Sequence, residues 1–209
     1  MFYYYMKIVF FPGSFKPPHK GHLRVVKSIL KNEKPDKIYI IISNKSRLLE
    51  EPFQKKLNQF SKNELDKLLI KYNLHTKKEI QNAANNNLIP SITPNISYKF
   101  WKEYINNNKV KIIISSQPSP IIFSFILAKT MLKPNDELIL VKSEKDELNS
   151  RFSIFDKLDI KRREILIPTF NELNSWQMRK AIFNKDWKGL EKFIPKKNHN
   201  LIKILKKII

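Results

Sequence analysis

Two nearly identical apolar segments constrain the fold of this chain more than any other feature: DKIYIIIS at 36–43 and KVKIIISS at 109–116. Each is a continuous β-branched run that ends in serine, which is typical of a strand covered on both faces of a parallel sheet. Three further apolar runs lie at 7–11, 136–143 and 163–169, and helix-like segments separate the runs. This alternation predicts an α/β fold, a three-layer sandwich around a parallel five-stranded sheet.

Helix signals lie between these runs. Residues 21–31 place apolar side chains on one helical face. Residues 61–72 begin with a capping box, in which Ser61 is followed three positions later by Glu64. The segment 119–132 opens with Ser-Pro and is almost unbroken in its apolar content, which predicts a helix buried in the fold.

Two regions differ from this strand and helix pattern. The stretch 48–91 contains QNAANNN and is the least patterned part of the chain, so we expect an insertion or lid over the C-terminal edge of the sheet. Residues 198–209 predict a short basic amphipathic C-terminal helix. For that helix we favour docking of its apolar face on the protein over contact with a membrane. The whole chain, 1–209, is expected to form one domain.

Composition excludes several classes of protein. The chain lacks cysteine, so neither a disulfide framework nor a cysteine-based zinc site can form. No apolar run reaches the roughly 18 residues of a membrane span, and the start, MFYYYMKIVFF, lacks the basic region of a signal peptide. We therefore expect a cytoplasmic protein with no membrane span, and the sequence leaves its oligomeric state open.

The formal net charge of +21 has two interpretations. A basic exterior attracts nucleic acid and nucleotide phosphates. However, Lys, Asn and Ile are all encoded by codons rich in A and T, and the lysines are scattered through the chain. We favour compositional drift over a dedicated nucleic-acid surface, because the sequence contains no basic stripe interleaved with aromatic residues.

One short loop concentrates residues that are scarce elsewhere. The chain has three glycines and four histidines, and FFPGSFKPPHKGHL at 10–23 holds Gly13, Gly21, His19 and His22. A glycine-bearing turn between a first strand and a helix is where open α/β sheets bind phosphates. Two imidazoles three positions apart could also begin a zinc site, and two adjacent prolines could simply stiffen a turn. We favour phosphate chemistry over both alternatives.

Residues 13–22 fit the pattern G-x-F-x-P-x-H-x-G-H at every defined position. The pattern resembles the signature of the HxGH nucleotidyltransferase superfamily, which includes nicotinamide mononucleotide and phosphopantetheine adenylyltransferases and glycerol-3-phosphate and choline-phosphate cytidylyltransferases. The resemblance implies a Rossmann-like nucleotidyltransferase fold. It also implies direct in-line displacement of pyrophosphate, usually with Mg²⁺ held mainly by the phosphates of the nucleotide. His19 and His22 would then stabilise charge on the α-phosphate, and the protein itself would supply no metal ligands.

A second element resembles the superfamily's I-S-S-T-x-x-R motif, whose arginine and backbone amides hold the outer phosphates. The stretch 173–179 reads LNSWQMR and is expected to begin a late helix. Ser175 and Arg179 fit the motif, whereas Trp176 stands where the superfamily has a hydroxyl residue. The resemblance implies that Arg179 binds the leaving pyrophosphate.

These observations define a candidate site. Lys16 beside the histidines and Arg47 beyond the second strand are each placed to meet a phosphate. Ser143, which ends the fourth strand, lies where this fold usually reads the base or the second substrate. The residues expected to be catalytic are His19, His22, Arg179 and Lys16. The residues expected to bind nucleotide are Pro12, Gly13, Ser14, Phe15, Gly21, Ser175, Trp176, Arg47 and Ser143.

Weaker similarity links further segments, such as SQPSP and DELILVKSEKD, to cytidylyltransferase-like proteins of phages and large DNA viruses. A viral source would place the protein in the host cytoplasm. The expected partners are ATP or CTP and a phosphorylated small molecule. The residue sequence PPHKGH at 17–22 is closer to nicotinamide mononucleotide adenylyltransferases than to choline-type enzymes, which favours ATP slightly. The alternative function is a catalytically weakened module on the same fold that binds nucleotides or nucleic acid.

Overall fold

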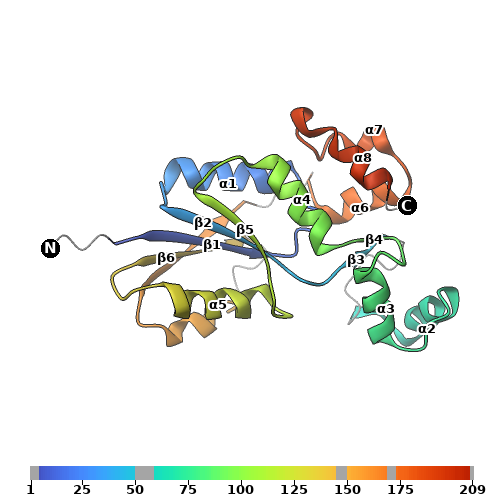
Figure 1. The fold of residues 1–209 in the computed structure, drawn as a ribbon, viewed down its shortest axis with the longest axis horizontal. Helices are drawn as coiled ribbons and strands as arrows, with labels where there is room; N and C mark the ends of the chain where they lie inside the picture. Colours follow the sequence, from blue (N-terminus) through green and yellow to red (C-terminus); the bar gives the residue numbers. More distant parts are fainter. Residues whose placement is uncertain (1–4, 50–58, 145–149, 169–172, 208–209) are drawn as a thin grey trace. The chain divides into compact units, whose positions relative to one another are not determined.

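All five apolar runs pair into one parallel sheet in the computed structural model, which describes residues 5–49, 59–144, 150–168 and 173–207 (Figure 1). The strand order is β5-β2-β1-β6-β7. The strands are β1 (Lys7–Gly13), β2 (Lys37–Ile42), β5 (Val110–Ile114), β6 (Glu137–Ser143) and β7 (Lys161–Ile167). The predicted α/β class with a parallel five-stranded sheet is confirmed.

The chain divides into two compact units. Unit 1 comprises residues 1–14, 21–44 and 105–172. Unit 2 comprises residues 15–20, 45–104 and 173–209. The short loop singled out in the sequence therefore crosses a boundary, because its central part belongs to unit 2 while the strand before it and the helix after it belong to unit 1.

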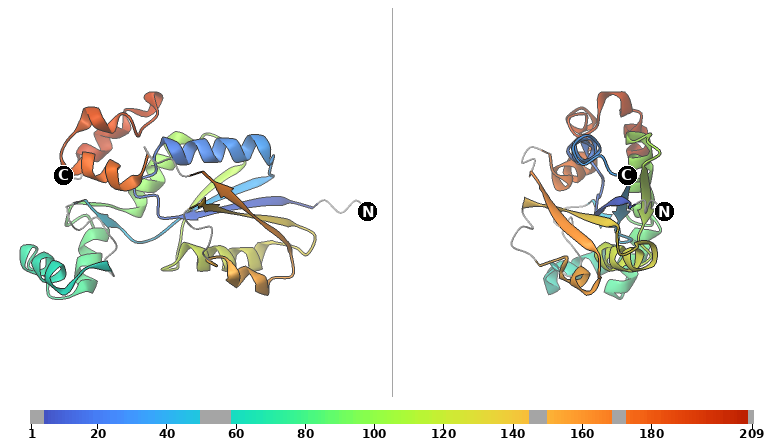
Figure 2. Two further views of the ribbon diagram at one scale, coloured as in Figure 1. Left: turned by 180° about the vertical axis from the view of Figure 1, so that it is seen from behind. Right: turned by 90° about the vertical axis from the view of Figure 1, so that its left-hand side faces the viewer.

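Unit 1 contains the sheet and the helices that cover it. Helices α1 (Lys20–Asn32) and α5 (Pro120–Met131) lie on opposite faces of the sheet, and the short helix η3 (Ser153–Lys157) precedes β7 (Figure 2). Alternate side chains of each strand point to opposite faces. On the α5 side the fully or nearly fully buried core comprises Ile8, Phe10, Tyr39, Ile41, Ala128, Leu138, Leu140, Phe152 and Phe155. The layers therefore form the expected three-layer Rossmann-like sandwich.

The prediction that 119–132 forms a buried helix is wrong in one respect. The helix forms, and Ser119 caps it by accepting a hydrogen bond from the amide of Ile122. Only Ser124 and Ala128 are buried within it, whereas Ile122 and Ile126 are each more than 40% exposed. The reason is that α5 is an outer layer, so one of its faces packs on the sheet and the other faces away from it.

Unit 2 contains most of the remaining helices. Two short strands, β3 (Arg47–Leu48) and β4 (Ser91–Ile92), pair antiparallel. The helices are α2 (Lys62–Lys71), α3 (Lys77–Asn85), α4 (Pro94–Tyr104), α6 (Ser175–Phe183), α7 (Trp187–Leu190), η4 (Lys196–Asn198) and α8 (Leu201–Lys206). The capping box at the start of α2 is confirmed.

The stretch 48–91 has a small apolar core of its own. Its buried members are Leu48, Leu68, Ile80, Ala83, Ala84 and Ile89. Residues 50–58 lie outside the described parts of the chain, and the role of the stretch as an insertion or lid stays a prediction. Leu201 and Leu205 of α8 are buried, whereas Ile208 and Ile209 lie outside the described residues. No helix in the described ranges is long and apolar enough to cross a membrane.

A buried carboxylate joins the entry of β1 to the turn before β6. Asp136 is 2% exposed, and its two oxygens accept hydrogen bonds from the amides of Met6, at 2.8 Å, and Lys133, at 2.9 Å. Amides that lose such an acceptor inside a protein remain desolvated without compensation.

We therefore expect Asp136→Ala to lower the free energy of unfolding by roughly 3 kcal/mol, because two amides lose their acceptor together. Urea unfolding measures this quantity directly. Asp159→Ala, which alters an exposed aspartate of the same unit, is the matched control and should change stability by less than about 0.5 kcal/mol. Equal effects of the two substitutions would contradict the assignment.

Candidate active site

Two carbonyls of the loop at 15–20 are held by side chains of α6. Arg179 donates from Nη1 to the carbonyl oxygen of Lys16 at 2.7 Å, and Ser175 donates from Oγ to that of Pro17 at 3.1 Å. Both donors lie in the second motif and both acceptors in the first. The two motifs that the sequence analysis treats as parts of one site are therefore in direct contact within unit 2.

A third carbonyl of the same loop is held from α4. Tyr104 donates from its hydroxyl to the carbonyl oxygen of Pro18 at 3.2 Å. Phe15 adopts a left-handed backbone conformation, with φ 50°, and its ring packs edge to face on Trp101, with centroids 5.3 Å apart. Because proline carries no N–H, Pro17 and Pro18 cannot donate in a backbone ladder, and side chains donate to three carbonyls of this loop.

The start of α6 follows from its sequence. Asn174 caps the helix by accepting a hydrogen bond from the amide of Gln177 at 2.9 Å, so the helix expected at 173–179 forms. Met178 and Arg179 face the interior, and Arg179 is 7% exposed. Trp176 differs from both, because 51% of its surface is exposed. The residue that departs from the superfamily motif is therefore displayed at the surface.

Three cations of unit 2 influence one another. Lys16 is 1% exposed, and its burial together with the positive charge of Arg47 holds its pKa well below the usual value for lysine. Burial and the same Arg47 charge lower the pKa of Arg179 to about 10, and burial lowers the pKa of Arg47 itself. Charges that are desolvated and repel one another gain stability from an anion. The arrangement therefore suits a polyphosphate.

His19 is a neutral imidazole in this environment. It is 5% exposed, and burial lowers its pKa from 6.5 to about 4. A neutral imidazole carries one N–H donor, so near neutral pH His19 can donate a hydrogen bond to a phosphate oxygen without itself being charged. His22 lies in the first turn of α1, in unit 1, and is half-buried.

Other predicted residues lie at the carboxyl edge of the sheet in unit 1. Pro12 and Gly13 end β1, and the carbonyl of Gly13 accepts a hydrogen bond from the amide of Ser43 at 2.9 Å. Ser14 follows β1 directly, and Ser143 ends β6, which runs parallel to β1. Parallel neighbours end at the same edge, so these residues come from the edge where such sheets bind ligands.

The helix after the loop begins one residue earlier than Gly21, the expected start. Helix α1 starts at Lys20, and the amide of Lys20 donates to the carbonyl of Phe193 at 2.7 Å. Gly21 is buried within the first turn, and no glycine of the described chain has a positive φ. The residue with left-handed backbone in this loop is therefore Phe15, and not one of the glycines.

Tyr104 and Phe193 were missed as parts of the site. Tyr104 ends α4, and no local pattern in the sequence shows that its hydroxyl reaches a carbonyl 86 positions away. Phe193 contributes only a main-chain oxygen, which leaves no trace in residue identity. The described residues contain no group of three His, Asp or Glu side chains that could hold a metal ion.

The buried neutral His19 predicts a pH dependence of stability. Its pKa is lower in the folded protein than in the unfolded chain, so the unfolded chain binds more protons between about pH 6.5 and pH 4. The stabilisation is complete above pH 6.5 and is lost as the pH falls. Between pH 7.5 and pH 4.5 the loss amounts to roughly 2–3 kcal/mol.

Urea unfolding of His19→Gln should lack this part of the acid destabilisation, because glutamine does not titrate. His75→Gln, which alters an exposed histidine of the same unit, should retain the wild-type dependence. If His19→Gln and the parent lose stability equally on acidification, His19 is not buried in its neutral form.

Comparison with known proteins shows which family this chain matches. The model of cytidylyltransferase-like proteins matches residues 10–118. Among solved structures, a crystal structure of NadR protein in complex with NR covers 88% of this chain at 11% identity with a TM-score of 0.46, and this chain spans 43% of that one. No curated protein matches the sequence significantly. Because the family match covers more than half of the chain, the protein belongs to the cytidylyltransferase-like family of nucleotidyltransferases.

Proposed function

We propose that this protein transfers a nucleoside monophosphate unit from a nucleoside triphosphate to a phosphorylated small molecule and releases pyrophosphate. One observation carries the proposal: Arg179 and Ser175 of the second motif bind the carbonyls of Lys16 and Pro17 in the first. This contact places Arg179 beside the buried Lys16 backbone. A cluster of buried cations in a nucleotidyltransferase family suits the polyphosphate of the substrate.

The reaction needs positioning and charge stabilisation more than it needs a base. An oxygen of the acceptor phosphate is already anionic and attacks the α-phosphorus in line, while the bond from that phosphorus to the bridging oxygen of the β-phosphate breaks and pyrophosphate leaves. Neutral His19 donates a hydrogen bond to the α-phosphate, and His22 is assigned the same charge-stabilising role. Mg²⁺, bound to the phosphate oxygens, would neutralise charge on the triphosphate.

The cations have separate roles in this scheme. Lys16 and Arg47 bind the triphosphate, and Arg179 binds the leaving pyrophosphate. A guanidinium carries five N–H donors, so the bond from Arg179 to the loop is compatible with binding a phosphate as well. Pro12, Gly13, Ser14 and Phe15 are assigned to binding of the phosphates, together with Gly21 in the first turn of α1.

The proposed substrate is assigned from the loop sequence and from two further residues. We favour ATP over CTP because of the loop sequence PPHKGH at 17–22. Ser143 at the end of β6 and the exposed Trp176 on α6 are the residues proposed to meet the base or the acceptor. The viral source and the cytoplasmic location stay predictions from the sequence, which leaves the oligomeric state open.

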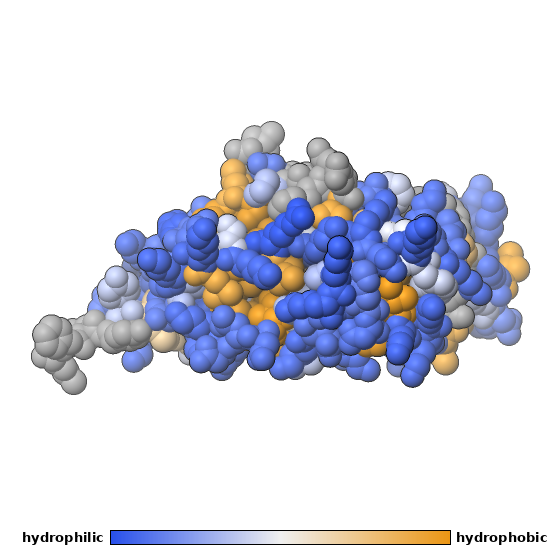
Figure 3. All heavy atoms as spheres, turned by 90° about the horizontal axis from the view of Figure 1, so that it is seen from above, coloured by the Kyte–Doolittle hydropathy of each residue, from blue (hydrophilic) through white to orange (hydrophobic). Residues whose placement is uncertain are grey.

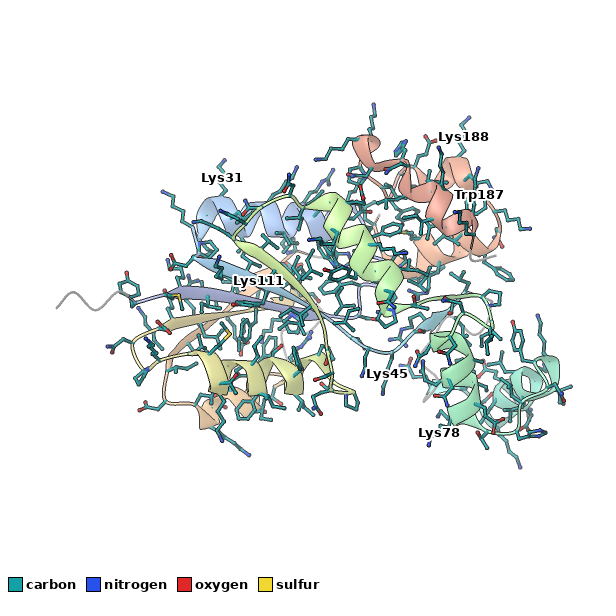
Figure 4. The ribbon with its side chains drawn as sticks, viewed as in Figure 1. Lys31, Lys45, Lys78, Lys111, Trp187 and Lys188 are labelled. Carbon is teal, nitrogen blue, oxygen red and sulfur yellow. The ribbon has the colours of Figure 1, made fainter. Side chains whose placement is uncertain are left out.

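A second candidate function is a non-catalytic module that binds nucleotides or nucleic acid. The net charge of +21 and the replacement of a motif hydroxyl by Trp176 favour it. Against it, the lysines are distributed over both units: Lys31, Lys78, Lys111 and Lys188 come from α1, α3, β5 and α7 (Figure 4). The face drawn in Figure 3 is largely hydrophilic, with apolar residues between the polar ones.

Pyrophosphate release tests the proposed function. ATP and CTP are each combined with nicotinamide mononucleotide, phosphopantetheine and glycerol 3-phosphate, and at least one pair should give turnover. In that pair, His22→Ala should lower kcat by about 100- to 1,000-fold, because a donor to the transition state is lost. His75→Ala, an exposed histidine, is the control and should retain activity.

Absence of turnover with every pair, together with tight and salt-sensitive binding of DNA or RNA, would favour the non-catalytic module instead. Retention of full activity by His22→Ala would contradict the role of the loop in catalysis.

Tryptophan fluorescence tests whether Trp176 meets the base. Trp176 is exposed, whereas Trp101 is buried and Trp187 is half-buried. If an aromatic base stacks on its indole, ATP or CTP should quench the fluorescence and inorganic tripolyphosphate, which has no base, should not. Trp176→Phe should abolish the quenching, and Trp187→Phe should preserve it. Equal quenching by tripolyphosphate would show that Trp176 senses phosphate binding alone.

A further inference from the structure

His19 is held through both of the peptide groups that flank it. The carbonyl of the preceding group, from Pro18, accepts the hydrogen bond from Tyr104 at 3.2 Å. The N–H of the following group, from Lys20, donates to the carbonyl of Phe193 at 2.7 Å. A peptide group is planar, so each bond orients a whole plane that carries the backbone of His19. The two bonds together restrict the backbone dihedrals of His19 and with them the direction of its side chain.

The hydroxyl of Tyr104 is itself held in place. Tyr104 is the last residue of α4 and is 2% exposed. Its ring packs edge to face on Phe100, with centroids 5.9 Å apart, and on Trp101, with centroids 6.2 Å apart. Trp101 packs in turn on Phe15, at the start of the loop. These rings leave the phenol little freedom to turn away from Pro18.

Burial also keeps Tyr104 in the form that can donate. Removing the phenol from water raises its pKa above the usual value, so the O–H persists through the neutral and moderately alkaline range. The carbonyl of Phe193, which accepts the hydrogen bond from Lys20, belongs to the main chain, so no side-chain substitution removes it. Tyr104 is therefore the support whose hydrogen bond can be deleted while its ring is kept.

We infer that Tyr104 is a positioning residue that holds the loop peptide so that His19 points at the reacting phosphate. The inference rests on the proposed nucleotidyltransferase activity. Tyr104 need not touch the substrate, because its effect passes through the Pro18–His19 peptide. In well-oriented reactions a small displacement of one group costs a large factor in rate, so the effect should appear in kcat.

The test is Tyr104→Phe, which removes one oxygen atom and retains the ring. Its kcat should fall by about 10- to 100-fold with little change in KM for the nucleotide, because positioning is lost and binding is kept. The pKa of His19, followed by histidine NMR in the ligand-free protein, should rise from about 4 toward 6.5 as the loop loosens and water reaches the imidazole. Tyr98→Phe, in the same helix, is the matched control and should change neither quantity.

A purely structural role gives a different result. If Tyr104→Phe lowers the melting temperature but leaves kcat and the titration of His19 at their wild-type values, the inference is overturned. Should Tyr104→Phe fail to fold, Trp101→Phe keeps the hydroxyl but weakens the packing behind it. The same two changes are then expected with smaller size, and wild-type behaviour of both quantities overturns the inference.

Failure of the proposed function is distinguishable from failure of the inference. If the parent protein releases no pyrophosphate with any substrate pair, the function fails, but the NMR titration still shows whether Tyr104 controls the environment of His19. If the parent is active and Tyr104→Phe has both wild-type kcat and a wild-type His19 titration, the function stands and the positioning role is excluded.

Discussion

Three consecutive carbonyls, those of Lys16, Pro17 and Pro18, are the constraint on which the candidate site depends. Prolines at 17 and 18 remove two amides from the loop, so its oxygens need donors from elsewhere. Arg179 and Ser175 supply two of them from α6, and Tyr104 supplies the third from α4. These three hydrogen bonds hold the backbone of a loop without regular secondary structure, and that loop carries Lys16 and His19.

Burial and positive charge together determine the ionisation of several side chains in unit 2. Lys16 and Arg179 are nearly fully buried, and burial together with the positive charge of Arg47 lowers the pKa of each. Burial also lowers the pKa of His19 to about 4, so its imidazole is neutral near pH 7. Neutral donors and buried cations together fit a site that stabilises phosphate charge during the reaction and performs no proton abstraction.

Much of the fold could be predicted because its signals are local. Continuous β-branched runs predicted five parallel strands, and the cap signals at Ser61 and Ser119 predicted the starts of two helices. The extent of burial was harder to predict. Helix α5 is apolar all round, yet Ile122 and Ile126 are exposed, because burial depends on how many layers cover an element and not on its composition alone.

Part of the candidate site could be predicted for the same reason. The spacing of Gly13, His19, Gly21 and His22 is a local property of one loop, and so is the cap and charge pattern of 173–179. The partners of that loop are not local. Tyr104 lies 86 positions from Pro18, and Phe193 acts through a carbonyl that every residue type possesses. No residue pattern reports such contacts, because hydrogen bonding by the backbone is independent of the side chain that it carries.

The amino-acid sequence alone determined the kinds of elements in this protein, their order along the chain and the position of the loop with the HxGH-like pattern, because hydrophobic period, helix capping and motif spacing act over a few residues. Tertiary packing decided the rest. Lys16 is a surface residue by type and 1% exposed in the fold, and the ionisation of His19 follows its burial and not its sequence neighbours. Desolvation depends on everything that surrounds a group in space, and only the folded chain brings those surroundings together.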